Sequence, residues 1–271
     1  MLWKIARNQD ILFALFTSTT TRTTVTYCLA VKVNRGLIFA SDSRTNAGVD
    51  YVATYSKMRR YCWPGERVCV LLTSGSLATS QALMNAINRD LQDPDAAFNL
   101  RSGKQLYEVA QYIGKLSQEE QQRHAKAMEK SGSSAESNFI FGGQIAGQPP
   151  EIFHVYPQGN FISASDDTPY LQIGENKYGK PILDRIIAKT TSLEDAARCA
   201  MVSLDSTIRS NISVGPPVEL AMLQTDNIDE PFHSTYTLNS PMYKSMQKQW
   251  TQGLKRAFNR LPRFDWEKPE R

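Results

Sequence analysis

The sequence predicts an α+β fold: a four-layer αββα sandwich, in which two mainly antiparallel sheets lie between two layers of helices. Short runs of β-forming residues follow one another through tight turns, which favours antiparallel pairing of neighbours. Amphipathic helical segments come in pairs, one pair after each group of strands, which favours a helical layer on each outer face. The 271 residues are enough to bury a large core.

The first group of strands is predicted from runs rich in aliphatic, aromatic and β-branched residues. These runs lie at 27–33, 37–40, 57–62 and 67–72. The turn sequences Asn-Arg-Gly at 34–36 and Trp-Pro-Gly-Glu at 63–66 join them in hairpins. Between the hairpins, 45–48 is expected to be a loop, in which Gly48 supplies a positive φ.

The first pair of helices is expected to follow these strands. One helix begins with Ser74 or Ser76 as its N-cap and runs to about Leu91. The other is expected at 105–130, because apolar residues recur there at i, i+3 and i+4. Its second half, 118–130, is polar and is expected to project from the body.

The second group of elements repeats this pattern. Strands are predicted at 138–144, 151–156, 159–164 and 218–224. Helices are predicted at 176–187, 192–210 and 241–258. No internal repeat or linker is visible after residue 26, so we expect one domain at 26–240, followed by an amphipathic C-terminal helix and basic tail at 241–271.

The composition is typical of a globular protein, with 41% hydrophobic and 21% charged residues. The net charge of +4 reflects basic residues gathered near the C-terminus. No nucleic-acid-binding motif accompanies them, so a solvated helix face is favoured over a nucleic-acid partner. The apolar run at 11–16 is too short to span a membrane.

The cysteines and histidines show no metal-ligand spacing, and we expect neither a metal nor a cofactor. The cysteines are expected to be reduced and buried, as suits a cytoplasmic protein. They are Cys28, Cys62, Cys69 and Cys199.

The stretch 26–57 carries the candidate chemistry. Thr26 precedes the first strand, Asp42 ends the second and Lys57 opens the third. A hydroxyl nucleophile needs a base, which a freed α-amine of Thr26 itself would supply. The ammonium of Lys57 would favour the alkoxide, and Asp42 would keep Lys57 charged and oriented. Taken singly, the three are also explained as an edge-strand threonine, a turn aspartate and a solvated lysine.

This chemistry requires that Thr26 become the first residue of the mature chain. Residues 1–25 are open to three interpretations: a propeptide, a weak targeting segment, or a segment that is not translated. We favour the third, because Val25 can be encoded by GTG, which also serves as a start codon. Initiation there gives Met followed by Thr26, and removal of Met exposes the threonine.

The order of elements and the residues Thr26, Asp42, Lys57 and Gly75 resemble the proteasome-type N-terminal nucleophile (Ntn) hydrolases. Asp42 lies sixteen residues after Thr26, as in proteasome β-subunits, and no other threonine of the leader has an aspartate at that distance. The Lys-x-Arg-Arg sequence at Lys57 and the Asp-x-x-x-x-Ser-Asn sequence at Asp205 resemble the bacterial heat-shock threonine protease.

Longer blocks resemble the Anbu (ancestral beta subunit) family of bacterial proteasome homologues. They are TYC at 26–28, SDSRTNAGVD at 41–50, GENKYGKP at 174–181, LDST at 204–207, RSN at 209–211 and VGPP at 214–217. The resemblance implies an αββα sandwich, threonine-peptidase activity and self-assembly into a ring or open spiral. The chain departs from the family in its 25-residue leader, because family members typically begin at Met-Thr. It departs from the proteasome in Lys57, which lies one position nearer to Thr26, and in Gly174-Glu175-Asn176, where proteasomes carry a Gly-Ser pair.

Three further site residues follow from the resemblance and its chemistry. The N–H of Gly75, at a helix N-terminus, is placed to receive a developing oxyanion; the alternative is a helix-start glycine without a chemical role. Asp205 and Ser210 would orient the amine of Thr26; the alternative is local hydrogen bonding within their helix.

The favoured function is a threonine-type peptidase or amidohydrolase that uses Thr26 in a self-compartmentalising homo-oligomer. One alternative is a weakly active or inactive assembly module, whose helix 118–130 and C-terminal helix mediate contacts. Another is a hydrolase of a small γ-glutamyl or peptide-like metabolite. Genes for family members often lie beside ATP-grasp and transglutaminase-like genes, whose products would be its partners.

Overall fold

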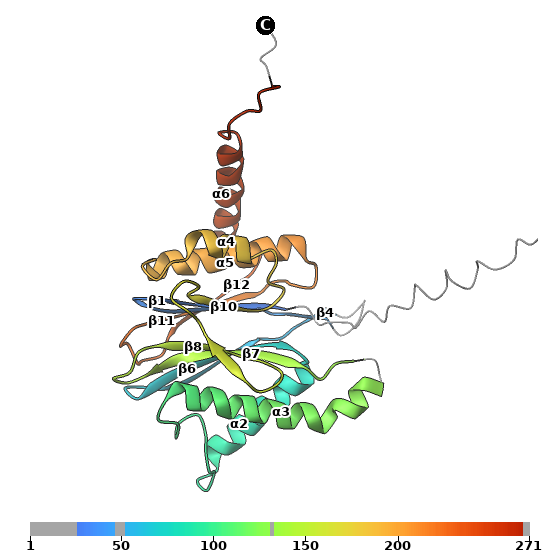
Figure 1. Cartoon of the computed structure of the whole chain (residues 1–271), viewed down its shortest axis with the longest axis vertical. Helices are drawn as coiled ribbons and strands as arrows, with labels where there is room; N and C mark the ends of the chain where they lie inside the picture. Colours follow the sequence, from blue (N-terminus) through green and yellow to red (C-terminus); the bar gives the residue numbers. More distant parts are fainter. Residues whose placement is uncertain (1–25, 47–51, 131–132, 268–271) are drawn as a thin grey trace, which may run out of the picture.

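The computed structural model describes residues 26–46, 52–130 and 133–267. Two five-stranded sheets lie face to face, with helices α4 and α5 over one and α2 and α3 over the other (Figure 1). Every strand pair in both sheets is antiparallel. The predicted four-layer αββα sandwich is confirmed.

The first sheet has the strand order β10-β1-β2-β11-β12. Its strands are β1 (Tyr27–Val33), β2 (Gly36–Asp42), β10 (Tyr170–Gly174), β11 (Val218–Gln224) and β12 (Phe232–Tyr236). Its outer face is covered by α4 (Lys180–Ile186) and α5 (Leu193–Ser210).

The second sheet has the strand order β5-β6-β7-β8-β9. Its strands are β5 (Met58–Trp63), β6 (Arg67–Gly75), β7 (Ser137–Ile145), β8 (Glu151–Val155) and β9 (Phe161–Ser163). Its outer face is covered by α2 (Leu77–Gln92) and α3 (Leu106–Lys130).

The core has three layers, because side chains of successive strand residues point to opposite faces. Tyr27, Leu29 and Val31 of β1 point outward into the cluster under α5. Cys28 and Ala30 point inward into the cluster between the two sheets. A third cluster lies between the second sheet and α2 and α3. The buried face-to-face sheets hold β1, and hence the position just before it, in a fixed place.

Several strands were not predicted. The segment expected as a loop at 45–48 begins instead as strand β3 (Arg44–Asn46), which pairs with β4 (Val52–Thr54); Gly48 lies outside the described residues. Strands β10 and β12 were also missed. Each has only five residues, and β12 is largely polar, so neither shows a strong apolar pattern.

Two helices differ from their predicted form. Helix α4 begins at Lys180, not at 176, because Pro181 lacks an N–H and its ring clashes with the preceding turn, which confines it to the first turn. The polar half of α3 does not project freely along its whole length. Gln121 donates to the Pro157 carbonyl oxygen at 3.0 Å, which fixes the middle of α3 to the turn after β8.

Helix α6 (Pro241–Phe258) rises from the α4–α5 layer away from the sheets (Figure 1). Tyr243 is its buried residue, whereas Leu254 and Phe258 are exposed. Among the described residues, no helix is both long and apolar enough to cross a membrane. Of the cysteines, Cys28, Cys69 and Cys199 are buried as predicted, but Cys62 is only half-buried.

His154 predicts a pH dependence of stability. Burial lowers the pKa of His154 from 6.5 to about 4, and Nε2 lies 3.1 Å from Asn138 Oδ1. Between these pH values the unfolded chain binds a proton that the folded chain does not, so stability falls as the pH falls through this window. We expect this to cost about 2 kcal/mol, after allowance for partial exposure, in urea titrations at pH 6.5 and 4.

The His154→Gln variant serves as the comparison, since glutamine cannot take up the proton. The loss of unfolding free energy between the two pH values should be smaller in the variant than in the original protein. Equal losses in the two proteins would contradict the assignment.

Candidate active site

Thr26 directly precedes β1 and is buried, with 3% of its surface exposed. Its carbonyl oxygen accepts a hydrogen bond from the Glu175 N–H at 2.7 Å, which extends the β1/β10 pairing by one residue. Gly174 permits this approach, because its φ is +84° and a Cβ would overlap the Thr26 carbonyl oxygen. Backbone pairing thus holds Thr26 at the end of the first sheet.

Lys57 and Asp42 form a buried ion pair. Lys57 Nζ donates to Asp42 Oδ1 at 2.6 Å and to the Arg44 carbonyl oxygen at 2.6 Å. The Tyr27 N–H also donates to Asp42 Oδ1, and the Gly215 N–H donates to Asp42 Oδ2, each at 3.1 Å. The structure therefore brings together the carboxylate and the ammonium that the sequence singled out.

The charge state of Asp42 is set by opposing effects. Burial raises the pKa of the Asp42 carboxyl above its ordinary value, while Lys57 and the N–H groups of Gly215 and Tyr27 oppose that rise. Each carboxylate oxygen has a backbone donor, so the anion is solvated by the protein in place of water. In return, Asp42 fixes the direction of the Lys57 ammonium.

Thr26, Lys57 and Gly75 line one narrow pocket of about 20 Å³, close to the space of one water molecule. The other residues that line it are Thr45, Tyr55, Thr73, Ser74, Leu77 and Ser80. The pocket therefore lies between the residue that precedes β1, strand β3, the segment before β5, the end of β6 and the start of α2. A nucleophile candidate, an ammonium and a backbone N–H donor candidate therefore meet in the same small space.

Gly75 is the last residue of β6 and lies directly before the N-cap of α2. Its φ is +103°, and a Cβ would overlap the Glu136 carbonyl oxygen, so the position requires glycine. Ser76 caps the helix, since its side chain accepts a hydrogen bond from the Thr79 N–H at 3.3 Å. The positive end of the helix dipole favours negative charge at this side of the pocket.

Asp205 and Ser210, which were expected to orient the amine of Thr26, both lie on α5. Asp205 Oδ1 accepts hydrogen bonds from Tyr243 at 3.2 Å and from Gln247, and Oδ2 accepts one from Arg209 Nε at 2.9 Å. Asp205 therefore anchors the base of α6. Ser210 is the exposed last residue of α5. Neither is among the residues that line the pocket of the candidate nucleophile.

Sequence reasoning did not assign roles to Glu175 and Asn211. Glu175 holds Thr26 through its backbone N–H, and its Oε2 accepts a hydrogen bond from Asn211 Nδ2 at 3.0 Å. The loop of Asn211 also contains Gly215, which donates to Asp42. The sequence signal that could have pointed to Glu175 was a glutamate at the position where proteasomes carry the serine of a Gly-Ser pair.

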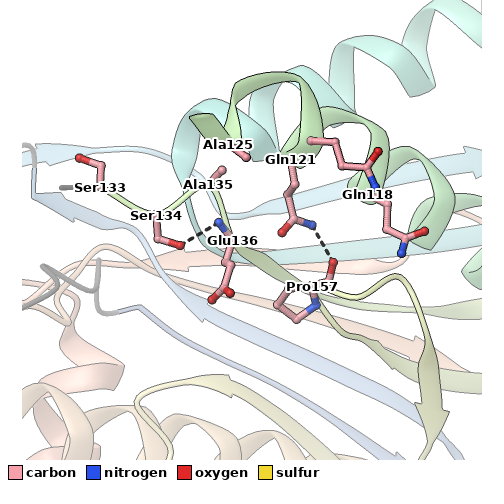
Figure 2. Close-up of a pocket in the computed structure, with 9 residues that line it drawn as sticks. Gln118, Gln121, Ala125, Ser133, Ser134, Ala135, Glu136 and Pro157 are labelled. Carbon is pink, nitrogen blue, oxygen red and sulfur yellow. Dashed lines mark hydrogen bonds between the residues drawn. The ribbon is translucent and has the colours of Figure 1, made fainter. Parts of the chain in front are cut away.

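A separate polar pocket of about 410 Å³ lies between α3 and the loop before β7 (Figure 2). Gln121 points toward Pro157 across it, and the Glu136 N–H donates to Ser134 Oγ at 3.1 Å (Figure 2). It shares no lining residue with the pocket of Thr26. In the described part of the chain, no cluster of three or more His, Cys, Asp or Glu side chains could hold a metal ion.

The two-sheet fold and the pocket at the start of β1 define the class of protein. A family model described as "Proteasome subunit" matches residues 23–223. The chain is thus a proteasome-type subunit with the sandwich fold of Ntn hydrolases.

Solved structures narrow the class. Anbu (ancestral beta-subunit) from Yersinia bercovieri is 41% identical, with a TM-score of 0.82, over 90% of this chain and 100% of that one. The Anbu complex from Pseudomonas aeruginosa, described as a helical assembly, is 42% identical, with a TM-score of 0.82, over 88% of this chain and 98% of that one. A comparison with curated protein sequences finds no match. The chain belongs to the Anbu family of proteasome-like proteins.

The buried ion pair predicts a large effect of Lys57→Met. This change leaves the Asp42 carboxylate buried without its ammonium partner, so we expect the free energy of unfolding to fall by about 3–5 kcal/mol at pH 7. The loss should be smaller at pH 4, where the carboxyl takes up a proton. Urea titrations at the two pH values measure both effects.

The double variant Asp42→Asn, Lys57→Met provides the matched control. It removes both charges, so it should be more stable at pH 7 than Lys57→Met alone. A double variant that is no more stable than the single one would show that the loss does not come from the unpaired carboxylate.

Proposed function

We propose that this protein is a threonine-type amidohydrolase that cleaves peptide or peptide-like amides with Thr26 as the nucleophile. The observation that carries the proposal is the shared pocket of Thr26, Lys57 and Gly75. The ion pair of Lys57 with Asp42, at 2.6 Å, supports it. The fold of the proteasome family supports the hydrolase class.

In this mechanism the α-amine of Thr26 is the general base, once it has been freed from residue 25. It takes the proton from Oγ1, which attacks the substrate carbonyl carbon and forms an oxyanion. The N–H of Gly75, at the positive end of α2, donates to that oxyanion. The protonated α-amine of Thr26 then gives its proton to the departing amine of the substrate. Water hydrolyses the ester that remains on Thr26.

Lys57 stays charged throughout and acts on the nucleophile electrostatically. Its positive charge stabilises the developing alkoxide of Thr26 and lowers the pKa of the neighbouring amine. Asp42 holds the Lys57 ammonium in place through the hydrogen bond from Nζ to Oδ1 at 2.6 Å. The site needs all three groups at once, since the hydroxyl alone is a poor nucleophile.

Thr26→Ala tests the nucleophile. An electrophilic probe directed at N-terminal threonine should add its mass to the protein, and peptide mapping should place the adduct on Thr26. We expect the adduct and amide hydrolysis to be lost in Thr26→Ala, whose pocket lacks the hydroxyl. Thr45→Ala, which changes another threonine lining the pocket, is the matched control and should keep the adduct.

The intact mass of the protein, measured in the same experiment, also identifies the first residue of the mature chain. Equal labelling of Thr26→Ala and the original protein would refute the assignment. So would a mature chain that still carries residues 1–25 and is nevertheless labelled.

We also propose that the protein self-associates through α6 and the segment that follows it. Large apolar side chains are exposed there: Met242, Leu254, Phe258, Leu261, Phe264 and Trp266. For example, 73% of the surface of Phe258 is exposed to solvent. Exposed apolar surface of this kind marks contact sites, and a relative is described as forming a helical assembly. A second copy of the chain is therefore the proposed occupant.

Charges placed on α6 test this surface. Leu254→Glu with Phe258→Glu should reduce the molar mass measured by light scattering after gel filtration, because burying the carboxylates in a contact is costly. Gln252→Glu, on the same helix, adds charge without removing an apolar side chain and should leave the mass unchanged. An unaltered mass in the double variant would show that α6 is not the contact.

A further inference from the structure

Glu175 lies opposite Thr26 at the end of the first sheet. The antiparallel register pairs Tyr27 with Gly174, and the next pair outward is Thr26 with Glu175. The Glu175 N–H donates to the Thr26 carbonyl oxygen at 2.7 Å, so the pairing extends to this position. Glu175 follows the end of β10, and Gly174 before it has a φ of +84°, so the direction of the Glu175 side chain is set by its own hydrogen bonds. The backbone of Glu175 is therefore a close neighbour of Thr26.

The Glu175 carboxylate is held by a side chain that is itself fixed. Asn211 Nδ2 donates to Glu175 Oε2 at 3.0 Å. Asn211 is the C-cap of α5, and its backbone N–H donates to the Thr207 carbonyl oxygen at 2.8 Å. Its own Oδ1 accepts a hydrogen bond from the Ser213 N–H at 2.9 Å. Its place at the end of α5 therefore positions the carboxylate.

The same loop reaches the other carboxylate of the site. The Gly215 N–H donates to Asp42 Oδ2 at 3.1 Å, and the Gly215 carbonyl oxygen accepts from the backbone N–H of Ser43 and of Arg44, each at 3.2 Å. The guanidinium of Arg44 donates to the Ile212 carbonyl oxygen. The loop 211–215 thus ties Asp42, the partner of the lysine, to the acidic group opposite Thr26.

We propose that Glu175 is a positioning residue for Thr26: its carboxylate orients the freed α-amine and neutralises the ammonium that forms during catalysis. This inference rests on the proposed function. The proton passes from Thr26 Oγ1 to the α-amine, and then from the ammonium to the departing amine. Glu175 remains ionised throughout and takes no proton, so it lowers the energy of the charged intermediate without altering the balance of the reaction.

Two effects on the amine then oppose each other. Lys57 lowers the pKa of the amine by repulsion, and Glu175 raises it by attraction. The remaining charged or titratable groups near the amine come from β2, β3 and the segment before β5: Asp42, Arg44 and Tyr55. Asp42 is neutralised by Lys57, which leaves Glu175 as the anion that acts on the amine.

The test measures the pKa of the Thr26 amine directly. The protein is expressed from Met placed directly before Thr26, and removal of Met is verified by intact mass. A chain of this extent folds, since the Yersinia relative aligns over its whole length with 90% of this one. The rate of reductive methylation of the Thr26 amine is followed against pH by peptide mass. We expect Glu175→Gln to lower the pKa of the amine by about one unit.

Two further variants complete the design. Glu119→Gln, an exposed carboxylate of α3, should leave the pKa of the amine unchanged. Asn211→Ala releases the carboxylate without removing its charge, so it should lower the pKa by less than Glu175→Gln does. It also serves as the informative variant if Glu175→Gln fails to fold. An amine pKa that is the same in the original protein and in the folded variants would overturn the inference.

Failure of the inference can be told apart from failure of the proposed function. Methylation needs no catalysis, whereas the electrophilic probe does. A lowered amine pKa in Glu175→Gln, with no probe adduct on Thr26 in the original protein, upholds the contact and refutes the hydrolase. An adduct formed at equal rates in both proteins, with equal amine pKa values, upholds the hydrolase and refutes the contact.

Discussion

The buried carboxylate of Asp42 is the constraint on which the site depends. A carboxylate taken out of water is tolerated only when hydrogen bonds and an opposite charge replace the lost solvation. Here the replacement comes from Lys57, Tyr27 and Gly215, which belong to three separate segments of the chain. The start of β1, the entry to β5 and the loop before β11 must therefore all be in place when Asp42 is buried.

This constraint couples the candidate active site to the assembly of the sandwich. Asp42 ends a strand of the first sheet, whereas Lys57 directly precedes β5 of the second. The pocket of Thr26 likewise joins the residue that precedes β1 of the first sheet to the end of β6 of the second, so it exists only when the sheets are packed against each other. The apolar layer between them, which includes Phe39 and Leu72, supplies the free energy for that packing.

The elements that could be predicted from the sequence are those whose pattern lies within one short segment of the chain. Strands β1 and β11 and helix α6 were predicted with their observed bounds, because each has a clear apolar period. Strand β10 was missed because its five residues carry too short a pattern, and its pairing with β1, which would have identified it, joins segments far apart in the chain. Asp42 was singled out from its spacing to Thr26, which directly precedes the neighbouring strand β1.

Other contacts at the site join segments far apart in the chain. Two partners of Asp205, Tyr243 and Gln247, lie on α6, and Glu175, which binds the Thr26 backbone, is far from Thr26 in sequence, so no spacing rule connects them. An N-terminal amine that serves as base has two requirements in conflict. It must be neutral before the reaction, which a nearby ammonium favours, and stabilised once it is charged, which a nearby carboxylate favours. In the proposed mechanism, Lys57 meets the first requirement and Glu175 the second, from different segments, so that mechanism needs the folded loop at 211–215 as much as it needs the nucleophile.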